Sequence, residues 1–175
     1  MGHTDRHARL LYRLISPNIL LFTEMVTAKA LLQGNHRSLL KFNPQEHPLV
    51  LQLGGAEADE MAKAAILAEQ AGFDEVNINV GCPSARVQSG AFGACLMKEP
   101  ETVAACVRSM KQNIGLPVTV KIRTGVDEYD SYQYLKQFVV TVSEAGCLTF
   151  IVHARKAWLK GLSPKQNREI PPLQY

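Results

Sequence analysis

The stretch ADEMAKAAILAEQAGFDEVNINVGCPS, residues 58–84, contains a complete helix–turn–strand unit. Its first fourteen residues are rich in Ala, Glu, Lys, Met and Leu, which favour a helix, and Gly72 stands where that helix is expected to end. Residues 75–80 form a short β-rich run that stops at the turn sequence GCP. A helix followed at once by such a strand predicts parallel strands with helical crossovers.

The same alternation continues in both directions along the chain. Further short apolar runs occupy residues 19–25, 49–53, 117–123 and 148–153, and further helix candidates occupy residues 6–15, 100–110 and 131–145. An Ala-Gly pair closes the helix at residues 71–72 and again at 145–146, which indicates a repeated unit. Such repeats are typical of a (β/α)8 barrel or a doubly wound sheet. The Rossmann form loses support because no G-x-G-x-x-G follows the first run.

Composition narrows the class of protein further. The 175 residues carry a net charge of +3, with 46% hydrophobic and 20% charged residues, which is ordinary for a globular domain and unlike a disordered tail or a fibre. We expect no membrane span, because no run approaches about 18 apolar residues. The four cysteines lack zinc-site spacing, so we expect no metal. Scattered cysteines without an apolar leader favour a cytoplasmic protein.

Polar side chains gather toward the carboxyl ends of the five expected strands. They are Glu24, Gln52, Asn77, Asn79, Lys121, Arg123, His153 and Arg155. Active sites of α/β barrels are built at this end, and buried polar groups are costly without partners, so we expect a shared ligand. Single residues also have structural explanations: Gln52 as a satisfied core amide, Lys121 as an outward-facing residue, and His153 as a structural histidine.

The phrase NINVGCPS at residues 77–84 resembles the signature of the tRNA-dihydrouridine synthases. The similarity extends over most of the chain and matches the A-type bacterial branch. Its other segments are LQLGG at residues 51–55, RVQSGAFGACLM at 86–97, VKIRTG at 120–125, HARKAWLKGLSP at 153–164 and NREIPPL at 167–173. A lone GCP would be a weak signal, whereas the ordered set is a strong one.

The resemblance implies a fold and a reaction. The fold is a (β/α)8 TIM barrel that carries FMN at its carboxyl face and is followed by a small helical tRNA-binding domain. The reaction is the NADPH-linked reduction of a D-loop uridine, at tRNA positions 20 and 20a, to 5,6-dihydrouridine. Against this pattern we expect residues 1–175 to be a partial FMN-binding barrel domain, about strands 2–6, without the helical domain. We expect the full-length parent to be a monomer.

The resemblance also implies roles for individual residues. Cys82 matches the catalytic thiol. The residues that resemble flavin contacts are Gln52, Lys121 and His153. The residues assigned to the uridine or the tRNA are Asn79, Arg123, Arg155 and Lys156. Reducing the C5–C6 bond requires a hydride at C6 and a proton at C5, and an ordinary thiol, with a pKa of about 8.5, is protonated at neutral pH and can donate that proton.

Residues 155–168, here called the basic segment, support an RNA partner independently. The basic residues of this segment are Arg155, Lys156, Lys160, Lys165 and Arg168, and it contains no Asp or Glu. Trp158 lies among them. Cations interleaved with an aromatic ring suit phosphate contacts and base stacking, although a solvated loop explains the pattern equally well.

Two other functions remain open on the sequence. One is an FMN barrel reductase that acts on a free pyrimidine, which the context of Cys82 and the basic segment disfavour. The other is an inactive RNA-binding or structural fragment. A barrel of about 250 residues needs all eight strands to close, and five strands would leave open edges. On that ground we expect this chain to bind FMN weakly or not at all.

Overall fold

A computed structural model describes residues 3–34 and 36–175. The strands are β1 (Leu21–Phe22), β2 (Val26–Thr27), β3 (Leu49–Gly54), β4 (Glu75–Asn79), β5 (Val118–Arg123) and β6 (Phe150–His153). The longer helices are α1 (Arg6–Ile15), α4 (Ala58–Ala71), α6 (Pro100–Asn113) and α7 (Tyr132–Glu144). The shorter ones are α2 (Ala28–Gln33), α3 (His36–Leu39), α5 (Ala85–Ser89) and α8 (Gln166–Glu169), with 3₁₀ turns η1 (Pro44–Glu46) and η2 (Gly93–Lys98).

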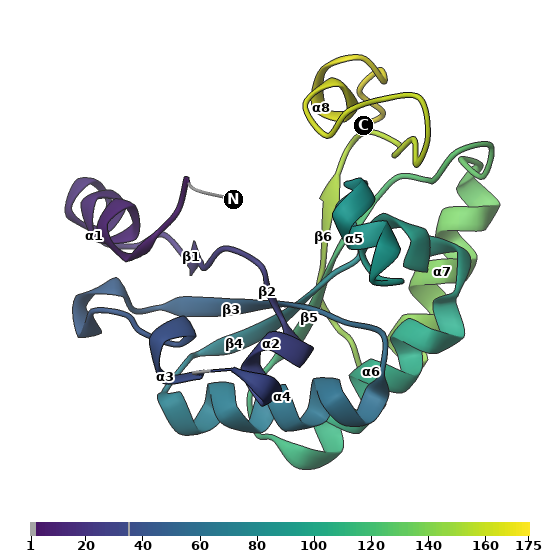
Figure 1. Cartoon of the computed structure of the whole chain (residues 1–175). Coiled ribbons are helices and arrows are strands. Elements are labelled where there is room, and N and C mark those ends of the chain that lie inside the picture. The colour runs from purple at the N-terminus through teal and green to yellow at the C-terminus, as the bar shows by residue number, and fades with distance from the viewer. Residues whose placement is uncertain (1–2, 35) are drawn as a thin grey trace.

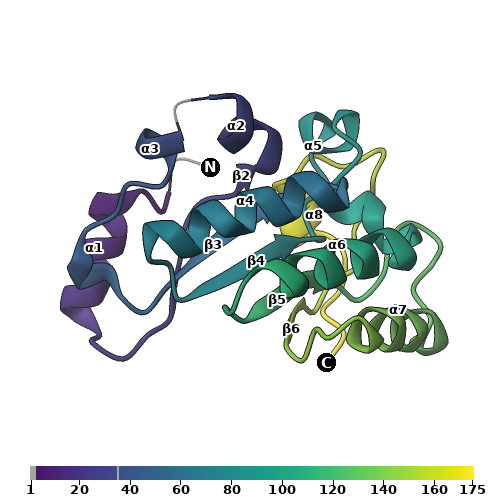
Figure 2. The same ribbon diagram turned by 90° about the horizontal axis from the view of Figure 1, so that it is seen from below.

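All strand pairs are parallel, in the order β1-β3-β4-β5-β6, with β2 pairing on β3. Helices α4, α6 and α7 cover one face of this curved sheet (Figures 1 and 2). The arrangement is a parallel half-barrel, which confirms the expectation of an incomplete (β/α)8 barrel. The four long helices confirm the helix predictions, with bounds that differ by at most three residues.

The core lies between the sheet and its helices. Strand side chains alternate between the two faces, and those facing the helices are aliphatic and buried, including Leu51, Leu53, Ile78 and Val120. Helix α4 presents alanines to them and ends at Gly72, whose φ of +91° is a left-handed conformation that favours glycine. The repeated Ala-Gly sequence therefore ends a helix at the same stage of each unit.

The first predicted strand, residues 19–25, is wrong in detail: only Leu21–Phe22 of it form a strand, and a second short strand, Val26–Thr27, begins just after it. Between them, the backbone N–H of Thr23 still donates to Val50, but the Thr23 hydroxyl accepts from the N–H of Gln52 and donates to the Glu24 carbonyl. The Glu24 carboxylate accepts from the N–H groups of His3 and Thr4. Side-chain hydrogen bonds to the backbone thus replace the strand ladder at this point.

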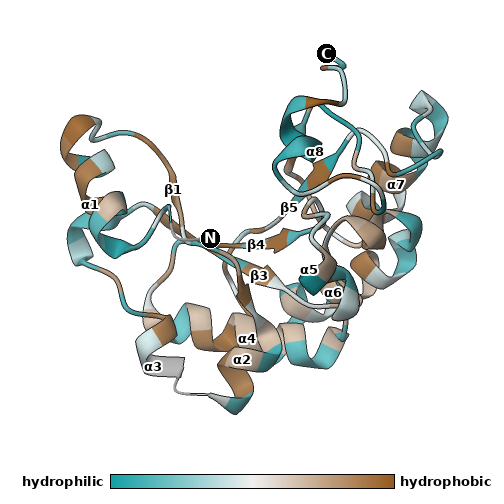
Figure 3. Cartoon of the chain, turned by 45° about the horizontal axis from the view of Figure 1, so that its top comes forward, coloured by the Kyte–Doolittle hydropathy of each residue, from teal (hydrophilic) through white to brown (hydrophobic). Residues whose placement is uncertain are grey.

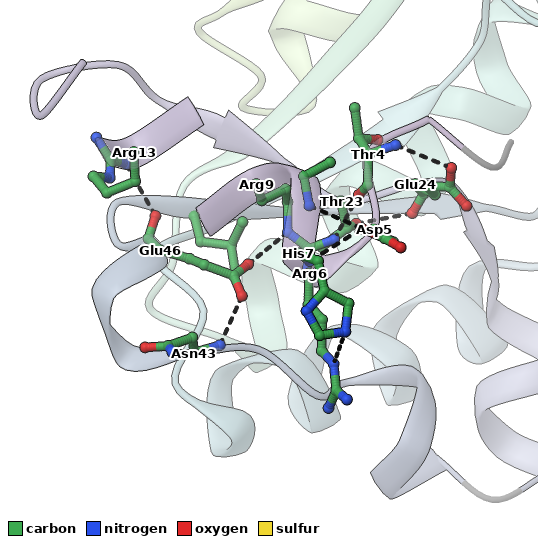
Figure 4. A network of polar contacts seen from close by, with 12 residues as sticks. Thr4, Asp5, Arg6, His7, Arg9, Arg13, Thr23, Glu24, Asn43 and Glu46 are labelled. Carbon is green, nitrogen blue, oxygen red and sulfur yellow. Dashed lines mark hydrogen bonds and ion pairs between the residues drawn. The ribbon is translucent and has the colours of Figure 1, made fainter. Parts of the chain in front are cut away.

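Helix α1 is fastened to the sheet edge by buried arginines (Figure 4). The Arg9 guanidinium contacts the buried Glu46 carboxylate at 2.6 Å, and Arg13 donates to the carbonyls of Glu46 at 2.9 Å and Pro48 at 3.2 Å. The outward residues of α1 include Leu14 and Ile15, which are more than 70% exposed. In Figure 3 part of this helix is brown, the colour of hydrophobic residues. Polar contacts rather than apolar burial therefore hold α1 in place.

Candidate active site

A row of amides crosses the sheet at the carboxyl ends of β3 and β4. The Gln52 amide donates to the Asn77 side-chain oxygen at 3.0 Å, and the Asn79 amide donates to the Gln52 oxygen at 2.8 Å. Asn77 in turn donates to the Thr119 hydroxyl at 2.9 Å. These bonds fix the orientation of each amide, and they arise because the parallel register places Gln52 opposite Asn77 and Asn77 opposite Thr119.

Asn79 also shapes the loop that carries Cys82. Its side-chain oxygen accepts from the N–H of Gly81 at 3.2 Å and of Cys82 at 3.0 Å, which is the local turn chemistry that asparagine favours. The Cys82 sulfur is half-buried and lies 3.6 Å from the Ser84 hydroxyl, which caps the start of α5. The thiol is therefore held just beyond a strand end, at the place where the sequence predicted it.

Cys82 opens onto a cavity of about 1070 Å³. The cavity walls combine apolar side chains, among them Met25 and Phe92, with the guanidinium groups of Arg86 and Arg168. Of the residues with a predicted role in catalysis, flavin binding or tRNA binding, all of which lie in the described part of the chain, Cys82 alone lines it, together with Glu24 from the wider set at the strand ends. Because the carboxylates of Asp5 and Glu24 also line it, the cavity presents the thiol to a ligand with both apolar and polar parts.

Lys121 and Arg123 of β5 bring positive charge to this edge of the sheet, and His153 of the neighbouring strand β6 lies beside them. The register sets Lys121 opposite Ile151 and beside Asn79, and sets Arg123 opposite His153. Burial, with Arg123 nearby, lowers the pKa of the Lys121 ammonium. Burial and the surrounding cations lower the pKa of His153 to about 4, so this histidine is neutral at pH 7.

The side chains of Lys121 and His153 have no partners within the described part of the protein. Within residues 3–34 and 36–175, Lys121 and His153 make no side-chain hydrogen bond or ion pair, whereas Arg123 donates to the backbone carbonyls of Gly81 and Asn167. Half-buried cations without a carboxylate nearby are unfavourable unless a ligand compensates them. The cluster therefore suits an anionic or electron-rich group.

Arg155 and Lys156 lie at the start of the basic segment. The Arg155 guanidinium donates to the Pro171 carbonyl, and the Lys156 ammonium pairs with Asp130 at 2.8 Å while lying 4.4 Å from the centre of the Trp158 ring. The cation over the indole ring confirms that charge and aromatic surface are adjacent here. Both side chains are partly occupied by contacts inside the protein.

The structure also brings in two residues that sequence reasoning missed. Asn167 is fully buried, and its amide donates to the carbonyls of Trp158, Leu162 and Ser163, while its oxygen accepts from the N–H of Trp158. Gln88 donates to the carbonyls of Pro83 and Leu159. Neither stands out in the sequence, because polar residues in turns and short helices are usually solvated.

The other three cysteines differ from Cys82. Burial raises the pKa of the Cys106 thiol to about 11 and raises the pKa values of Cys95 and Cys147. All four cysteines are free, and their sulfurs outside the Cys82 loop donate to backbone carbonyls. Thiols of this kind are poor nucleophiles and poor metal ligands.

The described residues form neither a metal-binding group of acidic, His or Cys side chains nor a membrane-spanning helix. No group of three or more His, Cys, Asp or Glu side chains is placed to hold a metal ion among these residues. Likewise, the helices formed by residues 3–34 and 36–175 include none that is long and apolar enough to cross a bilayer.

Fold and site together define an α/β-barrel protein whose ligand site, with one accessible thiol, lies at the carboxyl edge of a parallel sheet. The family model described as "Dihydrouridine synthase (Dus)" matches residues 1–175, and the chain belongs to this family. This finding confirms the resemblance drawn from the sequence.

Curated bacterial relatives agree with the family match. A protein named tRNA-dihydrouridine(20/20a) synthase from Shewanella oneidensis is 62% identical over 98% of this chain and 51% of its own length. Proteins of the same name from Vibrio parahaemolyticus and Synechocystis are 58% and 55% identical, over 98% and 100% of this chain and over 53% and 52% of theirs. The chain spans about half the length of the curated relatives it matches.

Proposed function

We propose that this protein takes part in the flavin-dependent reduction of uridine to 5,6-dihydrouridine in the D-loop of tRNA, at positions 20 and 20a. The observation that carries the proposal is the position of Cys82. Its thiol opens onto a large cavity and stands beside a fixed row of amides and the Lys121 ammonium, which has no partner in the described structure. The printed names of the relatives support tRNA as the substrate.

The residues of this chain fit an FMN cofactor. The ring system of a flavin is flat, apolar on its faces and rich in hydrogen-bonding atoms along one edge. Gln52 would face that edge with a fixed amide, Lys121 would offer the positive charge that lacks a partner, and His153 would supply a neutral imidazole. When bound, the flavin would supply the hydride to C6 of the uracil and would recover it from NADPH.

A side chain of the protein supplies the proton. Adding hydride to C6 leaves the developing negative charge at C5 and O4, and the proton that completes the reduction must arrive at C5. We assign this step to the Cys82 thiol, whose sulfur donates the proton and regains one from solvent. The asparagine-bound backbone on its N-terminal side holds the sulfur in one place, which reduces the entropic cost of the transfer.

The substrate side is assigned to Asn79, Arg123, Arg155 and Lys156. Asn79 and Arg123 act next to the thiol, through the backbone groups that they bind. Arg155 and Lys156 open the basic segment, where phosphates would meet cations and the Trp158 ring would offer a stacking surface. A base that is stacked in tRNA must leave the stack to reach Cys82, and the cavity gives it space.

We place the protein in the cytoplasm, with tRNA as its macromolecular partner and the full-length protein as a monomer.

The test incubates the purified protein with FMN, NADPH and an unmodified tRNA transcript, and measures dihydrouridine at positions 20 and 20a by mass spectrometry. The proposal expects the modified base at one or both positions and no reduction of free uracil. Turnover of the free base alone would support a free-pyrimidine reductase instead. Tight tRNA binding without any NADPH oxidation would support an RNA-binding role.

A further inference from the structure

The backbone on each side of Cys82 is held by a side chain from another element. Arg123 of β5 donates from Nε to the Gly81 carbonyl at 3.1 Å, and Gln88 of α5 donates from Nε2 to the Pro83 carbonyl at 2.8 Å. The carbonyl of Cys82 itself accepts from the N–H of Ala94 at 2.9 Å. Three successive carbonyls around the thiol therefore have fixed partners.

The same two side chains also hold the basic segment. A second guanidinium nitrogen of Arg123 donates to the Asn167 carbonyl at 3.0 Å, and the Gln88 amide nitrogen also donates to the Leu159 carbonyl at 2.8 Å. Each side chain thus bridges one carbonyl next to Cys82 and one carbonyl of the basic segment. The two bridges start on opposite sides of the cysteine, so together they hold the backbone both before and after the thiol.

The basic segment is itself a tightly bonded unit. The buried Asn167 side chain ties residues 158–163 together, and the Asp127 carboxylate accepts from the N–H of Leu159 at 2.8 Å while pairing with Lys98. Lys160 and Lys165 remain exposed on its surface. A displacement of these lysines would therefore move the whole bonded segment, including the carbonyls of residues 159 and 167, and would not be absorbed by a local change in the loop.

We infer that Gln88 and Arg123 are positioning residues that couple occupancy of the basic segment by an RNA backbone to the placement of the Cys82 thiol. The inference rests on the proposed function for the identity of the polyanion, but the coupling itself follows from the two bridges. RNA phosphates that attract the exposed lysines would shift the basic segment. Gln88 and Arg123, which donate to carbonyls of both segments, would transmit this shift to the loop around Cys82. The thiol would then adopt its reactive position when the polynucleotide is bound.

The experiment measures the rate at which iodoacetamide alkylates Cys82, resolved from the other three cysteines by peptide mass spectrometry. It is run with and without a saturating unmodified tRNA transcript. In the wild-type protein we expect tRNA to change the Cys82 rate by about fivefold or more, in the range of ordinary coupling between two sites. The other three thiols should show no such change, because they lie outside the bridged loop.

The decisive variant is Gln88→Met, which keeps the length of the side chain and removes both donated hydrogen bonds. We expect the tRNA effect on the Cys82 rate to fall to about twofold or less, while the Kd for tRNA stays within about twofold of wild type. Gln88→Lys restores a donor and should recover part of the effect. Gln133→Met on α7, an exposed residue, is the matched control and should behave as wild type.

Two results would overturn the coupling. One is a tRNA effect on Cys82 that persists unchanged in Gln88→Met, which would mean that tRNA merely covers the thiol. The other is the absence of any tRNA effect in the wild-type protein. A tRNA effect that disappears in Gln88→Met supports the coupling even if the protein forms no dihydrouridine, and in that case only the proposed reaction fails. Arg123→Lys, which loses the forked geometry, provides a second variant if Gln88→Met unfolds.

Discussion

The Cys82 loop and the cluster formed by the Lys121 ammonium and the neutral His153 imidazole lie side by side at the same edge of the sheet, yet they are built in opposite ways. The loop has hydrogen-bond partners for its backbone groups on both sides of the cysteine. The described structure gives the Lys121 ammonium and the His153 imidazole none. The first region is organised before any ligand arrives, whereas the second is organised to receive one.

This difference separates two kinds of site residue. A residue that organises the protein should affect stability when it is replaced, because its partners lose their hydrogen bonds. A residue that awaits a ligand should affect binding and leave stability unchanged or improved, because its burial is not compensated in the free protein. Replacing members of each region therefore tests whether the Cys82 loop and the Lys121–His153 cluster differ in this way.

The largest expected effect is on catalysis, from Cys82→Ser. The substitution is nearly isosteric and should leave the unfolding free energy unchanged, while the formation of dihydrouridine falls by about 100-fold or more, the usual share of general acid catalysis. The measurement is the initial rate with an unmodified tRNA transcript. Cys95→Ser serves as the matched control, since that thiol lies away from the cavity lining and should keep full activity.

The next effect is on stability, from Asn79→Ala in the organised region. The variant leaves the Gln52 oxygen and the N–H groups of Gly81 and Cys82 without their partner, and we expect it to lower the unfolding free energy by about 1–3 kcal/mol. Urea denaturation measures this loss. Asn79→Asp keeps the acceptor for both N–H groups but cannot donate to Gln52, so its loss should be smaller. Equal stability of wild type and Asn79→Ala would contradict a preorganised loop.

Lys121→Met, in the cluster with His153, should weaken FMN binding without lowering stability, which is the opposite of the result expected for Asn79→Ala. Removing a half-buried ammonium that has a lowered pKa and no partner should keep or raise the urea midpoint. In the full-length protein, the Kd for FMN should rise by about tenfold, as expected for the loss of one favourable charge contact. Flavin fluorescence gives the affinity, and Lys136→Met on the surface of α7 is the control. A loss of stability like that of Asn79→Ala would show that Lys121 belongs to the organised region.

The sequence predicts the hydrogen bonds that organise the Cys82 loop less well than it predicts the cluster of Lys121 and His153. Periodicity and turn residues place α4, β4 and the Cys82 turn correctly, because those signals are local. The shared ends of parallel strands then bring Gln52, Lys121 and His153 together. The bridges made by Gln88 and Arg123 depend on contacts between residues 71 and 44 positions apart in the chain. No local pattern encodes them, and the split of the first strand at Thr23 has the same origin.

The smallest effect concerns pH and His153. Burial and then the charges of Arg123, Lys121, Arg155 and Arg168 lower its pKa from 6.5 to about 4. Between these values the unfolded chain binds more protons than the folded one, so this residue makes stability rise as pH increases from about 4 to 6.5. His153→Gln should flatten that part of the stability profile, and NMR of the imidazole should show it neutral down to about pH 4. If the cations act as proposed, a bound anion that compensates them would raise this pKa, and an unchanged titration with FMN present would argue against their contact with it.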